Sequence, residues 1–186
     1  MLKNIKTGVI GVGSMGQNHV RIYDEVSNLI AVSDVDKKQG LRLSKRYNAD
    51  YFADYADMLG KVDAVTIAVP TIYHEEVVER VANAGVHILV EKPLAPSVSN
   101  AKSMLTKAEM ANIVLSVGHI ERHNPVIKYA KEKILEGEWG KVITMSSKRV
   151  SLFPERIKDV GVIFDLSIHD LDILCYLSSS NPKSIY

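Results

Sequence analysis

The sequence has little cysteine, no long apolar run and no excess of charge of one sign. With one cysteine in 186 residues, Cys175, an internal disulfide is excluded. Its apolar surroundings indicate a packed thiol, which fits a reducing, cytoplasmic setting. No uninterrupted apolar segment approaches the roughly 18 to 20 residues of a membrane span, and the glycine-rich start is unlike a signal peptide. We therefore expect a soluble cytoplasmic protein with no membrane partner.

The charges are nearly balanced. Lysine and arginine number 23 and aspartate and glutamate number 22, for a formal net charge of +1. This balance gives no argument for a nucleic-acid partner or an anionic membrane surface. A small molecule or another protein is the expected partner, and the length suits one domain or one domain plus part of a second.

Short apolar runs alternate with amphipathic stretches through the first two thirds of the chain. Runs rich in valine and isoleucine, without sustained polar alternation, are typical of buried parallel strands. Such runs occupy residues 6–10, 29–33, 64–69, 87–90 and 113–117. Helical patterns lie between them at 15–26, 37–47, 73–84 and 98–110. This order predicts an α/β domain with a doubly wound parallel sheet over residues 1–119.

The rhythm changes after Gly118. Asn124 and Pro125 predict the N-cap and first turn of a helix that ends near Leu135. One strand is expected at 141–152, a loop at 153–161 and a helix at 164–174. We expect residues 120–186 to be the start of an α+β second domain. Because one strand cannot make a sheet, either this domain is incomplete in this chain or its strand pairs with a surface outside this sequence.

The stretch "GVIGVGSMGQNH" places Gly11, Gly13 and Gly16 in G-x-G-x-x-G register between a strand and a helix. The first glycine permits a tight turn, the second allows the backbone to approach a pyrophosphate, and the third allows close helix packing. The helix start at Ser14 and Met15 adds amides and partial positive charge. We expect these five residues to bind a dinucleotide, the alternative being a plain connecting turn.

Asp34 ends the second strand, 23 residues after Gly11. A carboxylate there can accept hydrogen bonds from ribose hydroxyls and would repel a 2′-phosphate. NAD is therefore expected as the cofactor in preference to NADP, although Lys37 and Lys38 lie near enough to offset part of that repulsion.

Residues that follow strands matter because ligands bind outside the carboxyl ends of parallel strands. In "AVPTIYH", Val69, Pro70 and His74 are expected to contact the cofactor. In "EKP", Glu91 and Lys92 are charged groups at the end of a buried strand, where charge is costly unless it is paired or acts on a ligand. Lys92 is thus a candidate proton carrier or hydrogen-bond donor to a substrate hydroxyl. The alternative is that Pro70 and Pro93 simply end their strands.

The stretch "GHIERHNP" offers His119 and His123 four residues apart. Zinc needs at least a third ligand and the chain has no thiolate cluster, so no metal site is expected. The histidines are instead expected to have a structural role or to contact substrate, and His119 and Arg122 are the candidates for contact with substrate.

The stretch "FDLSIHDLDIL" places Asp165, His169 and Asp172 at i, i+4 and i+7, which stacks them on one face of a helix between two apolar borders. The pattern is compatible with an acid/base site. In the alternative, Asp165 caps the helix while His169 and Asp172 bond to a neighbouring element.

With "GVGSMGQNH", "AVP", "EKP", "GHIERHNP" and "DLSIHDLD" in this order, nearly the whole chain resembles the Gfo/Idh/MocA family of sugar oxidoreductases. It looks most like the UDP-N-acetylglucosamine 3-dehydrogenase branch. The resemblance implies an N-terminal Rossmann domain that binds NAD or NADP. It also implies a second domain with a large open sheet, through which homo-oligomers form.

Carried over by motif, Lys92 matches the catalytic lysine of the family and Glu91 its neighbour near the nicotinamide ribose, so both are also expected to contact the cofactor. His169 matches the catalytic histidine, with Asp165 four residues before it. Two features depart from the family: "DVGVIFD" has only one glycine, Gly161, ahead of the aspartate, and family members are much longer.

The reaction that the resemblance implies is oxidation of a secondary hydroxyl of a sugar or nucleotide sugar. Hydride leaves carbon for the nicotinamide while a base takes the hydroxyl proton. His169 is the expected acid/base, because an imidazole titrates near neutrality. Asp165 and Asp172 would orient it or bind sugar hydroxyls, and Lys92 would bond to the reacting oxygen. The alternatives are a non-catalytic NAD-binding or regulatory module, and a scaffold that binds no dinucleotide.

Overall fold

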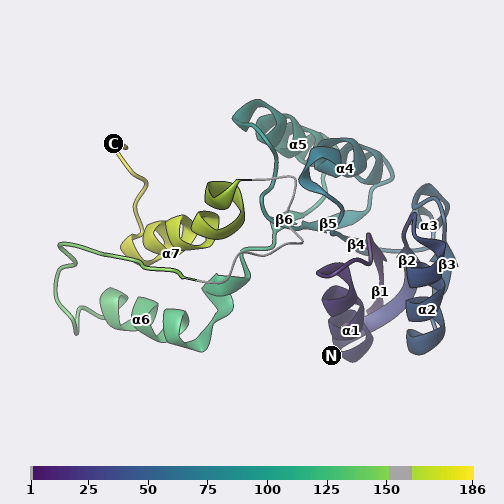
Figure 1. Cartoon of the computed structure of the whole chain (residues 1–186), viewed down its shortest axis with the longest axis horizontal. Helices are drawn as coiled ribbons and strands as arrows, with labels where there is room; N and C mark the ends of the chain where they lie inside the picture. The colour runs from purple at the N-terminus through teal and green to yellow at the C-terminus, as the bar shows by residue number, and fades with distance from the viewer. Residues whose placement is uncertain (1, 151–160) are drawn as a thin grey trace. The chain divides into compact units, whose positions relative to one another are not determined.

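A computed structural model of the chain describes residues 2–150 and 161–186. The chain divides into two compact units, Met1–Gly118 and His119–Tyr186. Figure 1 labels the helices and strands of both units. Within the described ranges, no helix is both long enough and apolar enough to cross a bilayer.

The first unit contains a six-stranded sheet in which every neighbouring pair of strands is parallel. The order is β3-β2-β1-β4-β5-β6, so the direction of winding reverses between β1 and β4. This order confirms the predicted doubly wound sheet, and ligands bind such sheets where the winding reverses. The strands are β1 (Leu2–Ile10), β2 (Ser27–Ser33), β3 (Asp50–Phe52), β4 (Ala64–Ile67), β5 (His87–Val90) and β6 (Leu115–Val117).

Helices cover both faces of the sheet. They are α1 (Gly16–Val26), α2 (Lys37–Tyr47), α3 (Ala56–Leu59), α4 (His74–Asn83) and α5 (Val98–Met110), with a 3-10 turn, η1 (Thr71–Tyr73), before α4. Figure 1 shows α1 and α2 near one half of the sheet and α4 and α5 near the other. The Asp36 carboxylate caps α2 by accepting from the amides of Lys38 and Gln39.

Adjacent residues of β1 and β2 enter different apolar cores. Val9 packs in the core that contains Val20 of α1 and Leu43 of α2. Ile10 packs in the core that contains Val78 of α4 and Met104 of α5. Because successive side chains of a strand point to opposite faces, the two cores lie on opposite sides of the sheet.

The sequence did not predict β3 and α3. Their stability comes from partners elsewhere: β3 pairs with β2, and the ring of Tyr51 occupies the space that a side chain at Gly40 would need. Tyr51 also donates from its hydroxyl to the Asp34 carbonyl at 3.0 Å. Elements of three or four residues have too little sequence periodicity to be recognised alone.

The second unit contains η2 (Ile120–His123), α6 (Pro125–Leu135), a π-helical turn η3 (Ile163–Ser167) and α7 (Ile168–Ser178). The predicted start of α6 is confirmed, since the Asn124 side chain accepts from the Val126 amide at 3.0 Å and Pro125 is the first helical residue. Lys131 of α6 donates from its ammonium to the Tyr176 carbonyl at 2.5 Å, near the end of α7.

Two predictions for this unit are corrected. Residues 141–150 form no strand, because a strand needs a ladder partner and the described residues of this unit supply none. The remainder of that predicted strand and residues 153–160 of the predicted loop lie outside the described residues. The predicted helix at 164–174 begins as the π turn η3, and Asp165 lies inside that turn instead of capping a helix.

Candidate active site

The glycine loop after β1 is tight at two positions and open at the third. Gly11 has φ +81°, and a Cβ there would lie 2.8 Å from the Ala68 carbonyl oxygen. A Cβ at Gly16 would collide with the Gly11 carbonyl, whereas a Cβ at Gly13 would meet nothing within 4 Å. The backbone at Gly13 is therefore open to a ligand, as a pyrophosphate cradle requires.

Asp34 is held against this loop. Its Oδ2 accepts from the Val12 amide at 2.6 Å and its Oδ1 accepts from the Asp36 amide at 2.8 Å. The carboxylate that the motif predicted for ribose binding thus lies beside the loop predicted for the pyrophosphate. Both belong to the first unit and follow neighbouring strands.

A cavity of about 490 Å³ opens at the carboxyl ends of β1, β2 and β4. It is lined by five of the predicted cofactor residues, Gly11, Gly13, Asp34, Val69 and Pro70. Gly16 is the first residue of the adjacent helix α1, Met15 is its N-cap and Ser14 directly precedes the N-cap. The cavity combines an open loop backbone, a carboxylate and apolar lining residues, which are groups that ligand sites of such sheets use.

Sequence reasoning missed other residues that line the cavity, namely Val35, Ala53, Tyr55, Tyr73, Glu76 and Val77. Ala53 and Tyr55 follow β3, so recognition of that strand would have found them. The ring of Tyr55 lies 5.3 Å from the guanidinium carbon of Arg80. Burial raises the pKa of the Tyr55 phenol by more than Arg80 lowers it.

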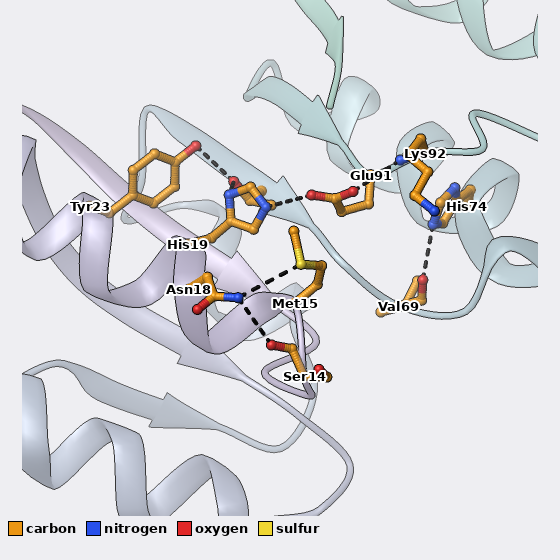
Figure 2. A network of polar contacts seen from close by, with 10 residues as sticks. Ser14, Met15, Asn18, His19, Tyr23, Val69, His74, Glu91 and Lys92 are labelled. Atoms are coloured by element: carbon orange, nitrogen blue, oxygen red, sulfur yellow. Dashed lines mark hydrogen bonds and ion pairs between the residues drawn. The ribbon is translucent and has the colours of Figure 1, made fainter. Parts of the chain in front are cut away.

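Glu91 and Lys92 follow β5 at the same edge of the sheet. The Glu91 side chain is buried, with the residue 6% exposed, and its Oε1 lies 2.7 Å from Nε2 of His19 (Figure 2). The Lys92 amide donates to its Oε2 at 3.2 Å. Burial disfavours the Glu91 carboxylate, but the hydrogen bond and charge of His19, together with Lys92, hold its pKa below the usual range.

His74 is almost completely buried, at 1% exposure. Its Nε2 lies 3.0 Å from the Val69 carbonyl and its Nδ1 lies 3.1 Å from the Leu94 carbonyl. The ring therefore joins the loop after β4 to the loop after β5. Direct contact of His74 with a cofactor stays a prediction.

Three predicted substrate residues of the second unit lie together. The Arg122 guanidinium donates from Nε to Asp172 Oδ2 at 2.8 Å and from Nη2 to Oδ1 at 2.5 Å. His119 Nδ1 lies 3.7 Å from Asp172 Oδ2. The bond to Asp172 raises the pKa of Arg122 further, so the guanidinium stays charged.

Only part of the predicted polar stripe, which comprises Asp165, His169 and Asp172, lies on one α-helix. His169 and Asp172 lie three residues apart on α7 and share a face, as predicted. Asp165 lies in η3, where hydrogen bonds run from i to i+5 and the α-helical period does not apply. Their catalytic roles stay predictions.

Asp170, between His169 and Leu171, was missed because it lies off the predicted stripe. It accepts from Arg149 Nε at 3.0 Å and from Ser147 Oγ at 2.8 Å. The Arg149 hydrogen bond and charge, with the Ser147 bond, hold the pKa of Asp170 below its usual range despite burial. Arg149 in turn lies 3.6 Å from Glu121, so α7, η2 and the segment before residue 151 share one ionic network.

Among residues 2–150 and 161–186, no group of three or more histidine, cysteine, aspartate or glutamate side chains could hold a metal ion. His119 precedes the 3-10 turn η2 and His123 ends it. Their four-residue spacing therefore does not stack them as it would on an α-helix.

A winding reversal between β1 and β4, a glycine loop that opens at Gly13 and a carboxylate at Asp34 together define a dinucleotide-binding Rossmann domain. The model of the Gfo/Idh/MocA family, described as an oxidoreductase family with an NAD-binding Rossmann fold, matches residues 5–119. The chain belongs to this family, which confirms the resemblance found in the sequence.

Three comparisons place the chain within the family. It is 34% identical over 182 residues to UDP-N-acetylglucosamine 3-dehydrogenase of Acidithiobacillus ferrooxidans, covering 98% of this chain and 57% of that protein. It is 31% identical over 195 residues to scyllo-inositol 2-dehydrogenase (NAD(+)) of Bacillus subtilis, covering 100% of this chain and 57% of that protein. A solved structure of the Acidithiobacillus enzyme has a TM-score of 0.89 at 34% identity, covering 97% of this chain and 58% of that one. The chain thus spans less than two thirds of the length of these relatives.

Proposed function

We propose that this chain carries the cofactor site and the acid/base helix of an NAD-dependent dehydrogenase that oxidises a secondary hydroxyl of a sugar or nucleotide sugar. One observation carries the proposal. The open glycine loop, the Asp34 carboxylate and the Glu91–Lys92 pair all follow parallel strands of one unit, at the edge where such sheets bind ligands.

The residues of the first unit fit a dinucleotide. Open space at Gly13 and the start of α1 suit the pyrophosphate, whose negative charge is favoured at a helix N-terminus. Asp34 suits the ribose hydroxyls, and its negative charge favours NAD over NADP. The name of the Bacillus relative, which specifies NAD(+), supports the same preference.

When bound, the nicotinamide accepts the hydride that leaves the alcohol carbon. The chain must hold that carbon and remove the hydroxyl proton. We assign Lys92 to donate a hydrogen bond to the reacting oxygen and His169 to take the proton. Asp165 would orient His169, and the cluster of His119, Arg122 and Asp172 would contact the sugar.

A nucleotide sugar is the first substrate to test, because the relative with 34% identity is named for UDP-N-acetylglucosamine. An inositol or simple sugar is the second, since the other relative is named for scyllo-inositol. Homo-oligomer formation and a cytoplasmic location stay predictions.

The experiment combines binding with turnover. NADH binding to the purified chain is measured by fluorescence, and NAD reduction is followed with UDP-N-acetylglucosamine, inositols and simple sugars. We expect NADH to bind and one sugar class to be oxidised. His169→Asn should abolish turnover and retain NADH binding. Lys92→Met should abolish turnover and weaken NADH binding, whereas Glu132→Gln, an exposed change on α6, should leave both turnover and binding intact.

Other outcomes contradict the proposal in different ways. Tight NADH binding without oxidation of any sugar would favour a non-catalytic NAD-binding or regulatory module. No dinucleotide binding at all would favour a scaffold. Full turnover in His169→Asn would overturn the assignment of the proton acceptor.

A further inference from the structure

The Glu91 carboxylate is buried and has three named neighbours. His19 Nε2 lies 2.7 Å from Oε1, and the Lys92 amide donates to Oε2 at 3.2 Å. On a third side lies Gly118, where an added Cβ would be 3.2 Å from the carboxylate atoms. The Glu91 side chain thus contacts α1, 72 residues earlier in the sequence, and lies close to the backbone of the residue that follows β6.

A second contact, on the other ring nitrogen, also holds the His19 side chain in place. Its Nδ1 lies 3.5 Å from the Thr66 hydroxyl of β4, and that hydroxyl donates to Tyr23 Oη at 2.8 Å. Tyr23 lies one turn further along α1, with its ring centroid 6.4 Å from that of His19. Figure 2 shows the resulting row of polar groups from Tyr23 through His19 to Glu91 and Lys92.

The position of His19 on α1 connects this row of polar groups to the glycine loop. His19 lies in the first turn of α1, three residues after Gly16, the last glycine of the loop. The helix that would hold the pyrophosphate is therefore bonded, through one side chain, to the residue that precedes Lys92. Neither the sequence nor the reaction assigned a role to His19.

We propose that His19 is a positioning residue, whose bond to the Glu91 carboxylate fixes Lys92 relative to the glycine loop. The role of Lys92 rests on the proposed function, but the link between His19 and Glu91 can be measured without it. The alternative is that His19 merely fills space between α1 and the sheet.

Two substitutions of His19, by amide side chains of different length, distinguish these possibilities. In His19→Gln the amide nitrogen reaches about as far as Nε2 and can still donate to Glu91. In His19→Asn the amide is one methylene shorter and cannot. Arg21→Ala changes an exposed ion pair with Glu25 on the same helix and serves as the control.

The first readout is the acid dissociation constant of Glu91 in the full chain. This constant is measured by carbon-13 NMR of the glutamate carboxyl groups as a function of pH, and Glu91→Gln identifies the signal of Glu91. Loss of a hydrogen bond to a carboxylate should lower this constant about tenfold in His19→Asn. His19→Gln should recover most of that change, and Arg21→Ala should show none.

The second readout is kinetic, with the substrate found for the wild-type chain. His19→Asn should lower kcat about tenfold while KM for NAD changes less than about threefold, because the loop still binds the pyrophosphate. His19→Gln should restore most of kcat. If the wild-type chain turns over no sugar, the proposed function fails while the Glu91 titration still decides the link.

The inference is overturned if the Glu91 dissociation constant is the same in wild type and His19→Asn, or if His19→Gln behaves no better than His19→Asn. Thermal melting and NADH binding of both variants show whether the fold is retained. If His19→Asn does not fold, Glu91→Met, which removes both oxygens that could accept from His19, takes its place, and a wild-type kcat in Glu91→Met overturns the inference.

Discussion

Asp172 of α7 and Arg122 of η2 form a two-pronged ion pair, with Nε and Nη2 of the guanidinium on the two carboxylate oxygens at 2.8 and 2.5 Å. The Asp172 side chain is only 10% exposed, and His119 lies on the same carboxylate. Asp172 therefore joins the start of the second unit to its last helix. A sugar hydroxyl that bound Asp172 would share it with Arg122.

The first prediction concerns this pair. Arg122→Lys should lower the free energy of unfolding of the second unit by about 1 to 2 kcal/mol, because lysine cannot form the two parallel bonds and the arginine is partly exposed. Urea unfolding followed by the fluorescence of Trp139, the only tryptophan, measures this unit. Glu132→Gln is the control, and a change of no more than about 0.3 kcal/mol in Arg122→Lys would contradict the prediction.

The second prediction concerns cofactor preference. Asp34→Asn removes the charge beside the ribose site but keeps an oxygen that can accept from Val12. NADH affinity should fall about tenfold, because a charge-assisted hydrogen bond to the ribose is lost. NADPH affinity should rise, because the carboxylate no longer repels the 2′-phosphate. Fluorescence titration with the two dinucleotides gives the ratio. Asp36→Asn makes the same charge change two residues away and preserves the helix cap, so its ratio should match wild type.

The third prediction compares two glycines of the loop. Gly16→Ala places a methyl group against the Gly11 carbonyl and should destabilise the first unit by about 1 to 3 kcal/mol. Gly13→Ala meets no protein atom within 4 Å, so the melting temperature should be retained. NADH affinity should nevertheless fall about tenfold, because the methyl group occupies the approach of the pyrophosphate. Undiminished NADH binding in Gly13→Ala would exclude this loop as the cradle.

The fourth prediction concerns the pH dependence of stability through Asp170. The bonds from Arg149 and Ser147 lower the pKa of Asp170 in the folded state, so its contribution to stability is present above the unfolded-state pKa of about 3.9 and is lost as the pH falls through the folded value. The wild type should therefore exceed Asp170→Asn by about 1 kcal/mol near neutral pH, since the partners are partly exposed. That difference should shrink below about pH 4. Urea unfolding at a series of pH values measures this difference. A stability difference between wild type and Asp170→Asn that grows as the pH falls would contradict the lowered pKa of Asp170.

Elements with a strong local signal, an apolar run or a helical period, were predictable from the sequence, and elements that depend on distant partners were not. The runs that became β1, β2, β4 and β5 are apolar, and the glycine motif placed Asp34 correctly beside the loop. The missed strand β3 is three residues long and forms because β2 offers it a free edge. The expected strand at 141–152 has the composition of a strand, but residues 141–150 have no described partner to pair with.

The candidate site shows the same division. Lys92 and Glu91 were recognisable because charge at the end of a buried strand is costly. His19 was not, because 72 residues separate it from Glu91, and only the strand order, with β5 next to β4, brings the residue after β5 within reach of α1. Asp165 illustrates a different failure, since the spacing assumed an α-helix and a π turn changes the period.

The outermost strands of the sheet have a consequence for how the molecule meets its neighbours. In the described part of the chain, β3 and β6 are the two edges, and each is three residues long. A short edge exposes few unpaired amide and carbonyl groups, so it is a poor template for another chain to extend. The first unit should therefore resist edge-to-edge aggregation even when it is concentrated.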